Sequence, residues 1–323
     1  MYGITNAGGG SGTKSTLIIS IDSGSTVQVY ANSTYTTLVK TATEKTAGQF
    51  WVKGLDNGTY YLKATKGIDV STMSYEITEY GVYRISMAYR SVPVFTYTGT
   101  YEVVEDDDTP ITDVAHYKEA NWKIRFLTSG TLNLTNLCGA WNGIDVFLVG
   151  AGGSKPQGGD HKGGAGGGYT LTHTAVTIAA GENYAVTIGE PTATDGGSSQ
   201  FGNLTAAIGG YAPSGNKGGA GGSGGGGGRS ANGTAGAGGS DGSDGTSAAG
   251  AGGAGQGTTT REFGEVGGAL YGGGGGGKSD SASGANGWTG SATNFGHGAH
   301  GNGNNTAYEA GGSGIVIIRN ARS

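Results

Sequence analysis

The sequence is poor in cysteine, proline and charged residues. A single cysteine, Cys138, stands among 323 residues, so no disulfide can form within the chain. Prolines number five, and charged residues make up 13% of the chain with a formal net charge of −5. This balance offers no basic stripe to neutralise phosphates, which argues against nucleic acid as a partner. No apolar run reaches the length needed to cross a bilayer, so membrane insertion is not expected.

The first residues also lack the features of a secretory signal. The stretch MYGITNAGGGSGTKS has neither a basic n-region nor an apolar h-region. Without an export signal or disulfides, we expect a protein that is assembled in the host cytoplasm and becomes extracellular by lysis, as virion proteins do.

Glycine is what the sequence has in abundance. Most of the 72 glycines lie beyond residue 150, and they are densest at 218–303, which contains no proline. Glycine loses more backbone entropy on folding than any other residue, so such a stretch needs a structural reason to be ordered. It is either a flexible Gly/Ser linker or a set of packed, left-handed helices of the polyproline type, with three residues per turn. Collagen is excluded because the three-residue glycine period is short and proline is missing.

Several features favour packed helices over a linker. Large apolar side chains recur within the glycine, and a flexible linker has no use for them. They are Phe263, Val266, Leu270, Tyr271, Trp288, Phe295 and Tyr308. The β-branched run within Gly314–Arg319 follows the glycine and predicts a buried strand. Because a core strand closes the chain, we expect an ordered insertion at about 214–312 whose ends return to one body.

The N-terminal part of the chain reads as β structure. After a Gly/Ser leader at 1–15 that we expect to be flexible, short alternating runs separated by turn residues predict a small β-sandwich at 16–90. The runs are Leu17–Ile21, Val27–Tyr30, Gln49–Val52, Thr59–Ala64, Ser74–Thr78 and Val82–Tyr89. The motif at Phe50–Thr65 resembles carboxypeptidase-regulatory-like or PEGA-like sandwich modules, and that resemblance implies a non-catalytic spacer.

Residues 91–121 are expected to form a connector between domains. They contain the acidic run Glu105–Asp108. Closely spaced carboxylates are ligands that Ca²⁺ prefers, although this run lacks the alternation and the distal Glu of an EF-hand loop. The alternative is a solvated hairpin tip.

Residues 122–323 predict a second β-sandwich that carries the glycine-rich insertion. Strands are expected at Trp122–Leu127, Gly130–Leu134, Ile144–Val149, Gly168–Leu171, Val176–Ile188 (a hairpin), Ser198–Gly202, Thr205–Ile208 and Ile315–Ile318. The predicted fold class is therefore all-β, with two small antiparallel β-sandwich domains and a packed polyglycine helix bundle inserted in the second.

Four motifs of this region resemble a known family. They are WKIRFLTSGTL (Trp122–Leu132), IDVFLVGAGG (Ile144–Gly153), GGAGGGYT (Gly163–Thr170) and GGSGIVIIR (Gly311–Arg319). In this order they resemble the glycine-rich domain of phage and prophage tail-fibre proteins, and a similar arrangement occurs in the glycine-rich region of anaplastic lymphoma kinase. The resemblance covers about residues 122–319 and implies a sandwich with bundled polyglycine helices that acts as a receptor-binding adhesin. Fibres of this kind imply a homotrimer, which no residue here demands.

No motif indicates catalysis or a bound cofactor. Gly150–Lys155 follows a strand as a phosphate loop does, but it lacks the GxxxxGK[ST] pattern and a following helix. His297 and His300 would share one face of a three-residue helix and so suggest a metal site, while polar surface residues are the alternative reading; we expect no metal. The acidic residues form no triad and no carboxylate pair, so an enzyme is not expected.

Binding through surface shape is the function that remains. Loops at the ends of a rigid bundle suit recognition, and arginine and aromatic residues dominate binding hot spots. The candidate receptor-binding residues are Arg229, Arg261, Phe263, Tyr271, Trp288, Phe295 and His297. A second reading applies to the apolar residues, in which Phe263, Leu270, Tyr271 and Trp288 fill gaps between the bundle and the sandwich.

These observations together predict a virion attachment protein. A phage tail-fibre or tail-tip protein would bind a bacterial surface glycan or outer protein and would assemble with other virion proteins. The alternatives are a capsid decoration or head-fibre protein, and a bacterial cell-surface adhesin.

Overall fold

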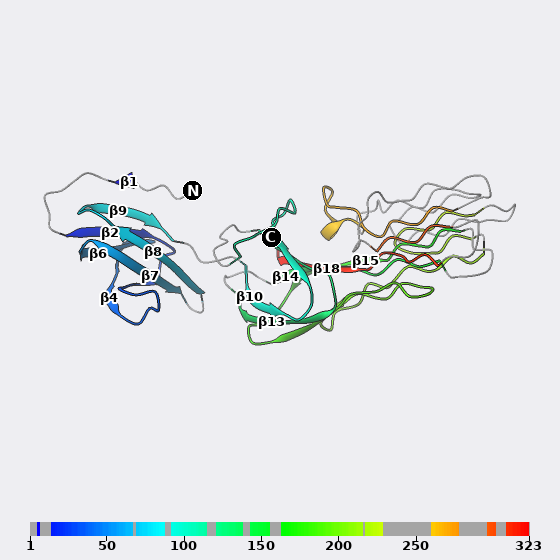
Figure 1. Ribbon diagram of the computed structural model, residues 1–323, viewed down its shortest axis with the longest axis horizontal. Helices are drawn as coiled ribbons and strands as arrows, with labels where there is room; N and C mark the ends of the chain where they lie inside the picture. Colours follow the sequence, from blue (N-terminus) through cyan, green and yellow to red (C-terminus); the bar gives the residue numbers. More distant parts are fainter. Residues whose placement is uncertain are drawn as a thin grey trace. The chain divides into compact units, whose positions relative to one another are not determined.

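The computed structural model divides into two compact units. It describes residues 5–6, 14–66, 69–87, 92–114, 121–137, 143–155, 163–215, 217–228, 260–277, 296–301 and 308–322. The first unit consists mainly of Met1–Val94 and the second mainly of Phe95–Thr112, Asn121–Leu134 and Trp141–Ser323. Both are built from β-strands (Figure 1). The described residues contain one 3₁₀ turn, η1 (Glu262–Gly264), and no helix with the length and apolar character of a membrane span.

The first unit contains two sheets. Its strands are β1 (Thr5–Asn6), β2 (Ser15–Ser20), β3 (Thr26–Tyr30), β4 (Leu38–Thr41), β5 (Thr43–Thr46), β6 (Gln49–Leu55), β7 (Gly58–Lys66), β8 (Asp69–Ile77) and β9 (Val82–Ser86). One sheet has the order β1-β9-β2-β6-β5 and the other β4-β3-β7-β8. β2 and β9 pair in parallel, whereas the other pairs are antiparallel.

Apolar side chains at alternate strand positions explain how the two sheets of the first unit pack together. Side chains at every second position of a strand point to the same face, and Val27 and Val29 of β3 are buried together with Leu62 and Ala64 of β7. These residues form one apolar cluster with Leu17 and Ile19 of β2 and Phe50 and Val52 of β6. The predicted sandwich is confirmed. The leader is corrected at one point, since β1 pairs with β9; residues 1–4 and 7–13 lie outside the described part.

The second unit also contains two sheets. Its strands are β10 (Val94–Tyr97), β11 (Tyr101–Val104), β12 (Lys123–Phe126), β13 (Gly130–Asn136), β14 (Ile144–Val149), β15 (Thr170–Val176), β16 (Asn183–Thr187), β17 (Gln200–Phe201) and β18 (Ile315–Asn320). The sheet orders are β10-β13-β16-β17 and β11-β12-β18-β14-β15. The predicted closing strand is confirmed as β18, which lies between β12 and β14 and is antiparallel to both.

The predicted connector at 91–121 is wrong where the structure describes its strands. β10 and β11 are edge strands of the two sheets of the second unit, and β11 pairs in register with β12. Their short lengths and the acidic turn that follows concealed this pairing, because edge strands have only one neighbour to specify them.

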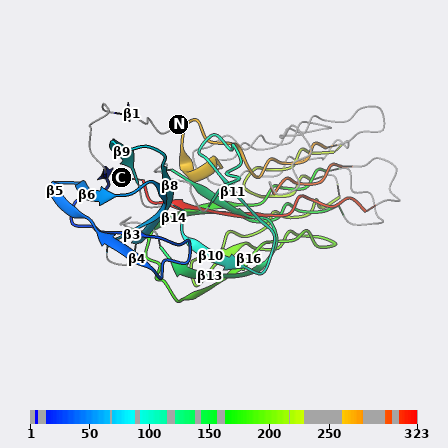
Figure 2. The same cartoon turned by 60° about the vertical axis from the view of Figure 1, so that its left-hand side comes forward.

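Three segments of the glycine-rich bundle are continuous in sequence with strands of the five-stranded sheet of the second unit. Segment 150–155 follows β14 directly, segment 163–168 comes just before β15, and segment 309–314 comes just before β18. Figures 1 and 2 show these segments leaving the strands as thin, wavy chains that run side by side. The sheet therefore sets the positions of three bundle segments at the ends that join the strands.

Segment 163–168, the central segment, shows the three-residue period of a polyglycine helix in its hydrogen bonds. Successive N–H groups are donated to three different neighbours, and each neighbour recurs at every third residue. The donor–acceptor pairs are Gly163–Gly215, Gly166–Tyr211 and Tyr169–Ile208; Gly164–Gly226 and Gly167–Ser223; and Ala165–Ala299 and Gly168–Gly296. Acceptor numbers fall as donor numbers rise, so these three neighbours run antiparallel to the central segment.

The carbonyl groups of the central segment serve further neighbours. Gly219 and Gly222 donate to the carbonyls of Gly164 and Gly167, Gly275 donates to Ala165, and Gly153 donates to Gly166. The segments bonded to 163–168 are thus 150–155, 208–215, 217–222, 223–228, 271–277 and 296–301. A helix with three residues per turn and no internal hydrogen bonds satisfies its backbone only in this way.

Close approach of backbones explains why these positions are glycine. A Cβ atom added at Gly167 would lie 1.8 Å from the carbonyl oxygen of Gly272, and one added at Gly164 would lie 2.0 Å from that of Gly275. Neither backbone can retreat without losing its hydrogen bonds. The predicted bundle is therefore present in the described residues. It also includes 150–155, 163–168 and 208–213, which precede the predicted insertion at about 214–312.

We expect Gly167→Ala to disrupt the bundle. The new methyl group overlaps a backbone carbonyl, and overpacking of this severity costs about 3 kcal/mol, the upper end of the usual range. The melting temperature of the second unit should fall by roughly 6–12 °C, and amide exchange across 163–168 should accelerate. Gly267→Ala is the matched control, because nothing lies within 4 Å of a Cβ at Gly267. Equal melting temperatures for the two variants would contradict the packed bundle.

Candidate functional site

The described bundle segments share one end, which lies away from the sheet and is called the distal end here. Its backbone contacts join residues that are far apart in sequence. The donor–acceptor pairs are Lys155–Glu309, Gly163–Gly215, Gly226–Gly275 and Gly301–Gly276. At least one residue bordering each of four stretches outside the described part of the chain lies at this end. The four stretches are 156–162, 229–259, 278–295 and 302–307. The fold therefore gathers the borders of four stretches at one place.

Several polar side chains lie at the distal end. Tyr308 is 45% exposed, and its hydroxyl donates to the carbonyl of Thr192 at 2.9 Å. The Nε2 atom of His300 lies 3.8 Å from a carboxylate oxygen of Glu309, and both side chains are half-exposed. The sequence singled out Tyr308 only as an aromatic residue within glycine. Its position at this end is fixed by its hydrogen bond to the remote 190–195 turn.

The structure separates the predicted receptor-binding residues into three groups. Arg229, Trp288 and Phe295 lie outside the described residues and stay predictions. Arg261 is half-buried and donates to the carbonyl of Gly268 at 3.1 Å, within its own turn. His297 is half-buried within the bundle, where its ring lies against Gly312.

Phe263 and Tyr271 are corrected, because they are not surface residues. Their exposed fractions are 9% and 1%. Both rings pack on Phe147 of β14, with ring centroids 5.7 Å and 5.1 Å away. With Val149, Ile315 and Ile317 they form a small apolar cluster. This burial matches the second reading of these two aromatics, in which they fill the space between the glycine-rich segment and the sheet. The same reading is wrong for Leu270, which is 44% exposed.

Segment 260–271, the flap, carries these two rings and also a buried carboxylate. Arg261 and Leu270 form a β-bridge at its base. Glu262 on η1 is 5% exposed and lies 2.8 Å from the ammonium nitrogen of Lys123 on β12. The hydroxyl of Tyr271 donates to the other oxygen of Glu262 at 2.7 Å. Burial and the neighbouring carboxylate raise the pKa of Tyr271 well above its ordinary value, so it stays a neutral donor.

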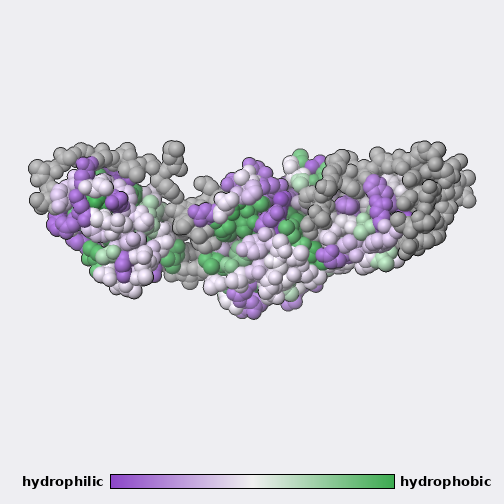
Figure 3. Space-filling view, viewed as in Figure 1, coloured by the Kyte–Doolittle hydropathy of each residue, from purple (hydrophilic) through white to green (hydrophobic). Residues whose placement is uncertain are grey.

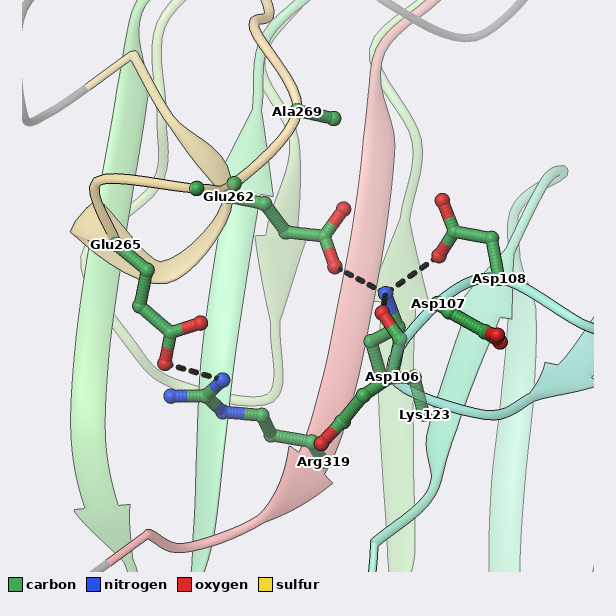
Figure 4. Close-up of a pocket in the computed structure, with 10 residues that line it drawn as sticks. Asp106, Asp107, Asp108, Lys123, Glu262, Glu265, Ala269 and Arg319 are labelled. Atoms are coloured by element: carbon green, nitrogen blue, oxygen red, sulfur yellow. Dashed lines mark hydrogen bonds and ion pairs between the residues drawn. The ribbon is translucent and has the colours of Figure 1, made fainter.

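The flap lies over a row of cations on the sheet. Figure 4 shows Glu262 and Asp108 pointing at Lys123, and Glu265 pointing at Arg319 of β18. Arg319 also reaches Asp145 of β14 at 3.1 Å, and its guanidinium lies 4.0 Å above the ring of Phe263. Lys123 and Arg319 face each other in the strand register. The interleaved carboxylates therefore offset the repulsion between these two cations.

The acidic run belongs to the same cluster. It forms the turn after β11, where the N–H of Asp108 donates to the carbonyl of Glu105. Asp106 pairs with Arg322, and Asp108 pairs with Lys123 and Arg125. Together with Glu265 and Arg319 these acids line a hollow of about 380 Å³. Asp106 and Asp108 are thus paired with cations of the chain itself, while their side chains stay 48% and 41% exposed to solvent. Within the described residues, no group of three or more His, Cys, Asp or Glu side chains is arranged to hold a metal ion.

Gly150–Lys155, which only superficially resembles a phosphate loop, has a structural role. The N–H groups of Gly152 and Gly153 are donated to the carbonyls of Gly312 and Gly166. They are consequently committed to the bundle and cannot surround a phosphate. This agrees with the sequence, where Gly150–Lys155 lacks the full phosphate-loop pattern.

We expect Glu262→Ala to destabilise the second unit strongly. The change removes the carboxylate that the buried ammonium of Lys123 and the hydroxyl of Tyr271 share, while Asp108 still pairs with Lys123. Breaking a buried pair costs up to about 3–5 kcal/mol. Asp56→Ala is the control, since it breaks the Lys14–Asp56 pair, whose side chains are 51% and 62% exposed. Exposed pairs contribute little to stability. Urea unfolding of both variants measures the difference, and a small effect at Glu262 would contradict a stabilising role for the cluster.

The stability of the bundle should decrease in acid because of His297. Burial lowers the pKa of His297 below its ordinary value of 6.5, and the nearby His300 acts in the same direction. The unfolded chain then takes up this proton at a higher pH than the folded chain. The contribution is therefore present above about pH 6.5 and is lost as the pH falls through the lowered value. Thermal melts between about pH 7 and pH 5 should show a smaller dependence for His297→Gln. A pH dependence of His297→Gln equal to that of the wild type would contradict this assignment.

The comparisons with known proteins identify the larger unit. A solved structure, of a DUF3823 family protein from Parabacteroides merdae, aligns with 62% of this chain and 96% of its own at 11% identity, but a TM-score of 0.20 supports no common fold. No curated protein matches the chain. The model of a family described as a glycine-rich domain matches residues 128–321. That range contains β13 to β18, all the bundle segments and the flap. The chain therefore belongs to the glycine-rich domain family.

Proposed function

We propose that this protein is a non-enzymatic attachment module that binds its receptor at the distal end of the polyglycine bundle. The observation that carries the proposal is the convergence of bundle segments at that end, on a scaffold held by backbone hydrogen bonds. Recognition loops are commonly carried by rigid scaffolds, because a fixed scaffold reduces the entropy lost on binding.

The proposed setting is a phage tail fibre or tail tip, and the receptor is a bacterial surface glycan or outer protein. This part rests on the resemblance of the motifs at 122–319 to tail-fibre domains. Arg229, Trp288 and Phe295 remain the candidate contacts from the sequence, and Tyr308 joins them as a half-exposed aromatic at the distal end. Other virion proteins would be the assembly partners, and a homotrimer would match other fibres.

The proposal is tested with an array of purified bacterial surface polysaccharides and with outer-membrane vesicles. We expect the full chain to bind at least one of these probes and Tyr308→Ala to weaken binding at least about tenfold, as for a moderate hot spot. Tyr80→Ala is the matched control, because Tyr80 is a comparably exposed tyrosine of the first unit (41%). Equal weakening by both variants, or no binding to any probe, would count against attachment at the distal end.

A capsid decoration protein is the alternative in the same experiment. Such a protein should bind neither the polysaccharides of the array nor the vesicles, but should bind virus particles that lack it. A cell-surface adhesin of bacteria should be detected on intact cells by an antibody against the second unit.

A further inference from the structure

A second hollow lies on the sandwich of the second unit and is called the slot here. It has a volume of about 490 Å³, a size typical of small-ligand sites. Its walls are the end of β15, the strand β16 and the turn that follows β17. β15 and β17 are each an edge strand of one of the two sheets of the second unit. None of the ion pairs of the flap takes part in it.

An ordered aromatic ring forms one wall of the slot. Tyr184 is half-buried and stacks on the fully buried Phe201, with ring centroids 5.5 Å apart and an interplanar angle of 12°. Its hydroxyl oxygen accepts the N–H of Ala179 at 2.9 Å, which holds the ring at both ends. Gly202 follows Phe201 with a φ of +52°, a conformation that favours glycine and turns the chain beside the ring.

The rim of the slot is polar and almost uncharged. Thr177, Glu182, Asn183 and Asn203 are exposed and line it beside Leu204. Asn183 accepts a hydrogen bond from the side chain of Asn133 at 2.7 Å. Among the residues that line the slot, Glu182 carries the single formal charge, and no cation is present. Phosphates and sugar acids would meet a carboxylate there without a compensating cation.

This combination fits one chemical class. A pyranose ring has an apolar face of C–H groups, which packs on an aromatic ring, and an equator of hydroxyl groups, which amides and carboxylates bind. We propose that the slot is a binding site for neutral pyranose sugars, with Tyr184 as the platform and with Asn203 and Glu182 as hydroxyl-binding groups. The site is separate from the distal end, so it does not depend on attachment there.

Saturation-transfer NMR on the full chain tests the proposal. The probes are the methyl glycosides of glucose, galactose, mannose and rhamnose, with glucuronic acid as the charged comparison. We expect at least one neutral glycoside to bind with millimolar affinity and to receive saturation on the C–H groups of one ring face. Glucuronic acid should bind at least about tenfold more weakly, because it places a second carboxylate beside Glu182.

Variants then assign the signal to the slot. Tyr184→Ala should weaken binding at least about tenfold, whereas Tyr184→Phe should keep most of it, since the ring remains. Tyr211→Ala is the matched control, because Tyr211 is 45% exposed in the same unit but does not line the slot. If Tyr184→Ala melts early, Asn203→Ala in the exposed turn replaces it and should weaken binding several-fold.

The outcomes also separate this site from the distal end. Unchanged binding in folded Tyr184→Ala and Asn203→Ala, or the absence of saturation transfer to every neutral glycoside, would overturn the proposal. Tyr308→Ala should leave glycoside binding unchanged while it weakens attachment. If the protein binds the glycosides but attaches to none of the surface probes, the slot proposal stands and only the proposed attachment function is contradicted.

Discussion

The structure of the larger unit depends on hydrogen bonds between backbones that lie in contact. The central segment 163–168 donates to three neighbours and accepts from others, with each neighbour recurring every third residue. A chain in this conformation has no partner for its N–H and C=O groups within itself, so each segment is ordered only when its neighbours are present. Glycine makes this possible because it lets the chains approach closely. The entropy that glycine loses on folding is offset by a bond for each backbone group and by the burial of the whole segment.

The bundle is oriented by the sheet and by the flap. Three bundle segments continue the strands β14, β15 and β18, which gives them the sheet's spacing at one end. The flap adds a second attachment, because Phe263 and Tyr271 bury against Phe147, and Glu262 meets Lys123 at 2.8 Å. Apolar burial supplies the larger part of the energy, while a buried ion pair contributes little net stability. We interpret the charged cluster as a device that fixes where the flap docks, since displacement would leave several buried charges unpaired.

This arrangement distinguishes two kinds of surface on the second unit. Figure 3 shows the described surface of the bundle in pale colours with a few separate hydrophilic residues, as expected for chains made mainly of glycine and alanine. On this face the described part of the bundle offers few side chains for recognition. Its end and the sandwich, which carries more side chains, are the chemically distinctive places. The distal end collects segment borders from remote parts of the sequence, whereas the slot is built from one short region, 176–204. Proposals for the two places rest on different residues.

Local pattern alone determined the β-sandwiches, the closing strand and the existence of a glycine bundle. The alternation of apolar residues at Val27 and Val29 predicts a buried face of a strand. The glycine-rich stretch is followed by a buried strand, which predicts that the stretch is ordered and packed. Tertiary structure decided the rest. Short runs such as 150–155 and 163–168 look like turns until their partners, up to 160 residues away, supply the hydrogen bonds. The pairing of Lys123 with Glu262 spans 139 residues, and the burial of Tyr271 depends on the same contact between flap and sheet. Spacing within a sequence carries no information about such distant pairs, because they form only when the sheet brings them together.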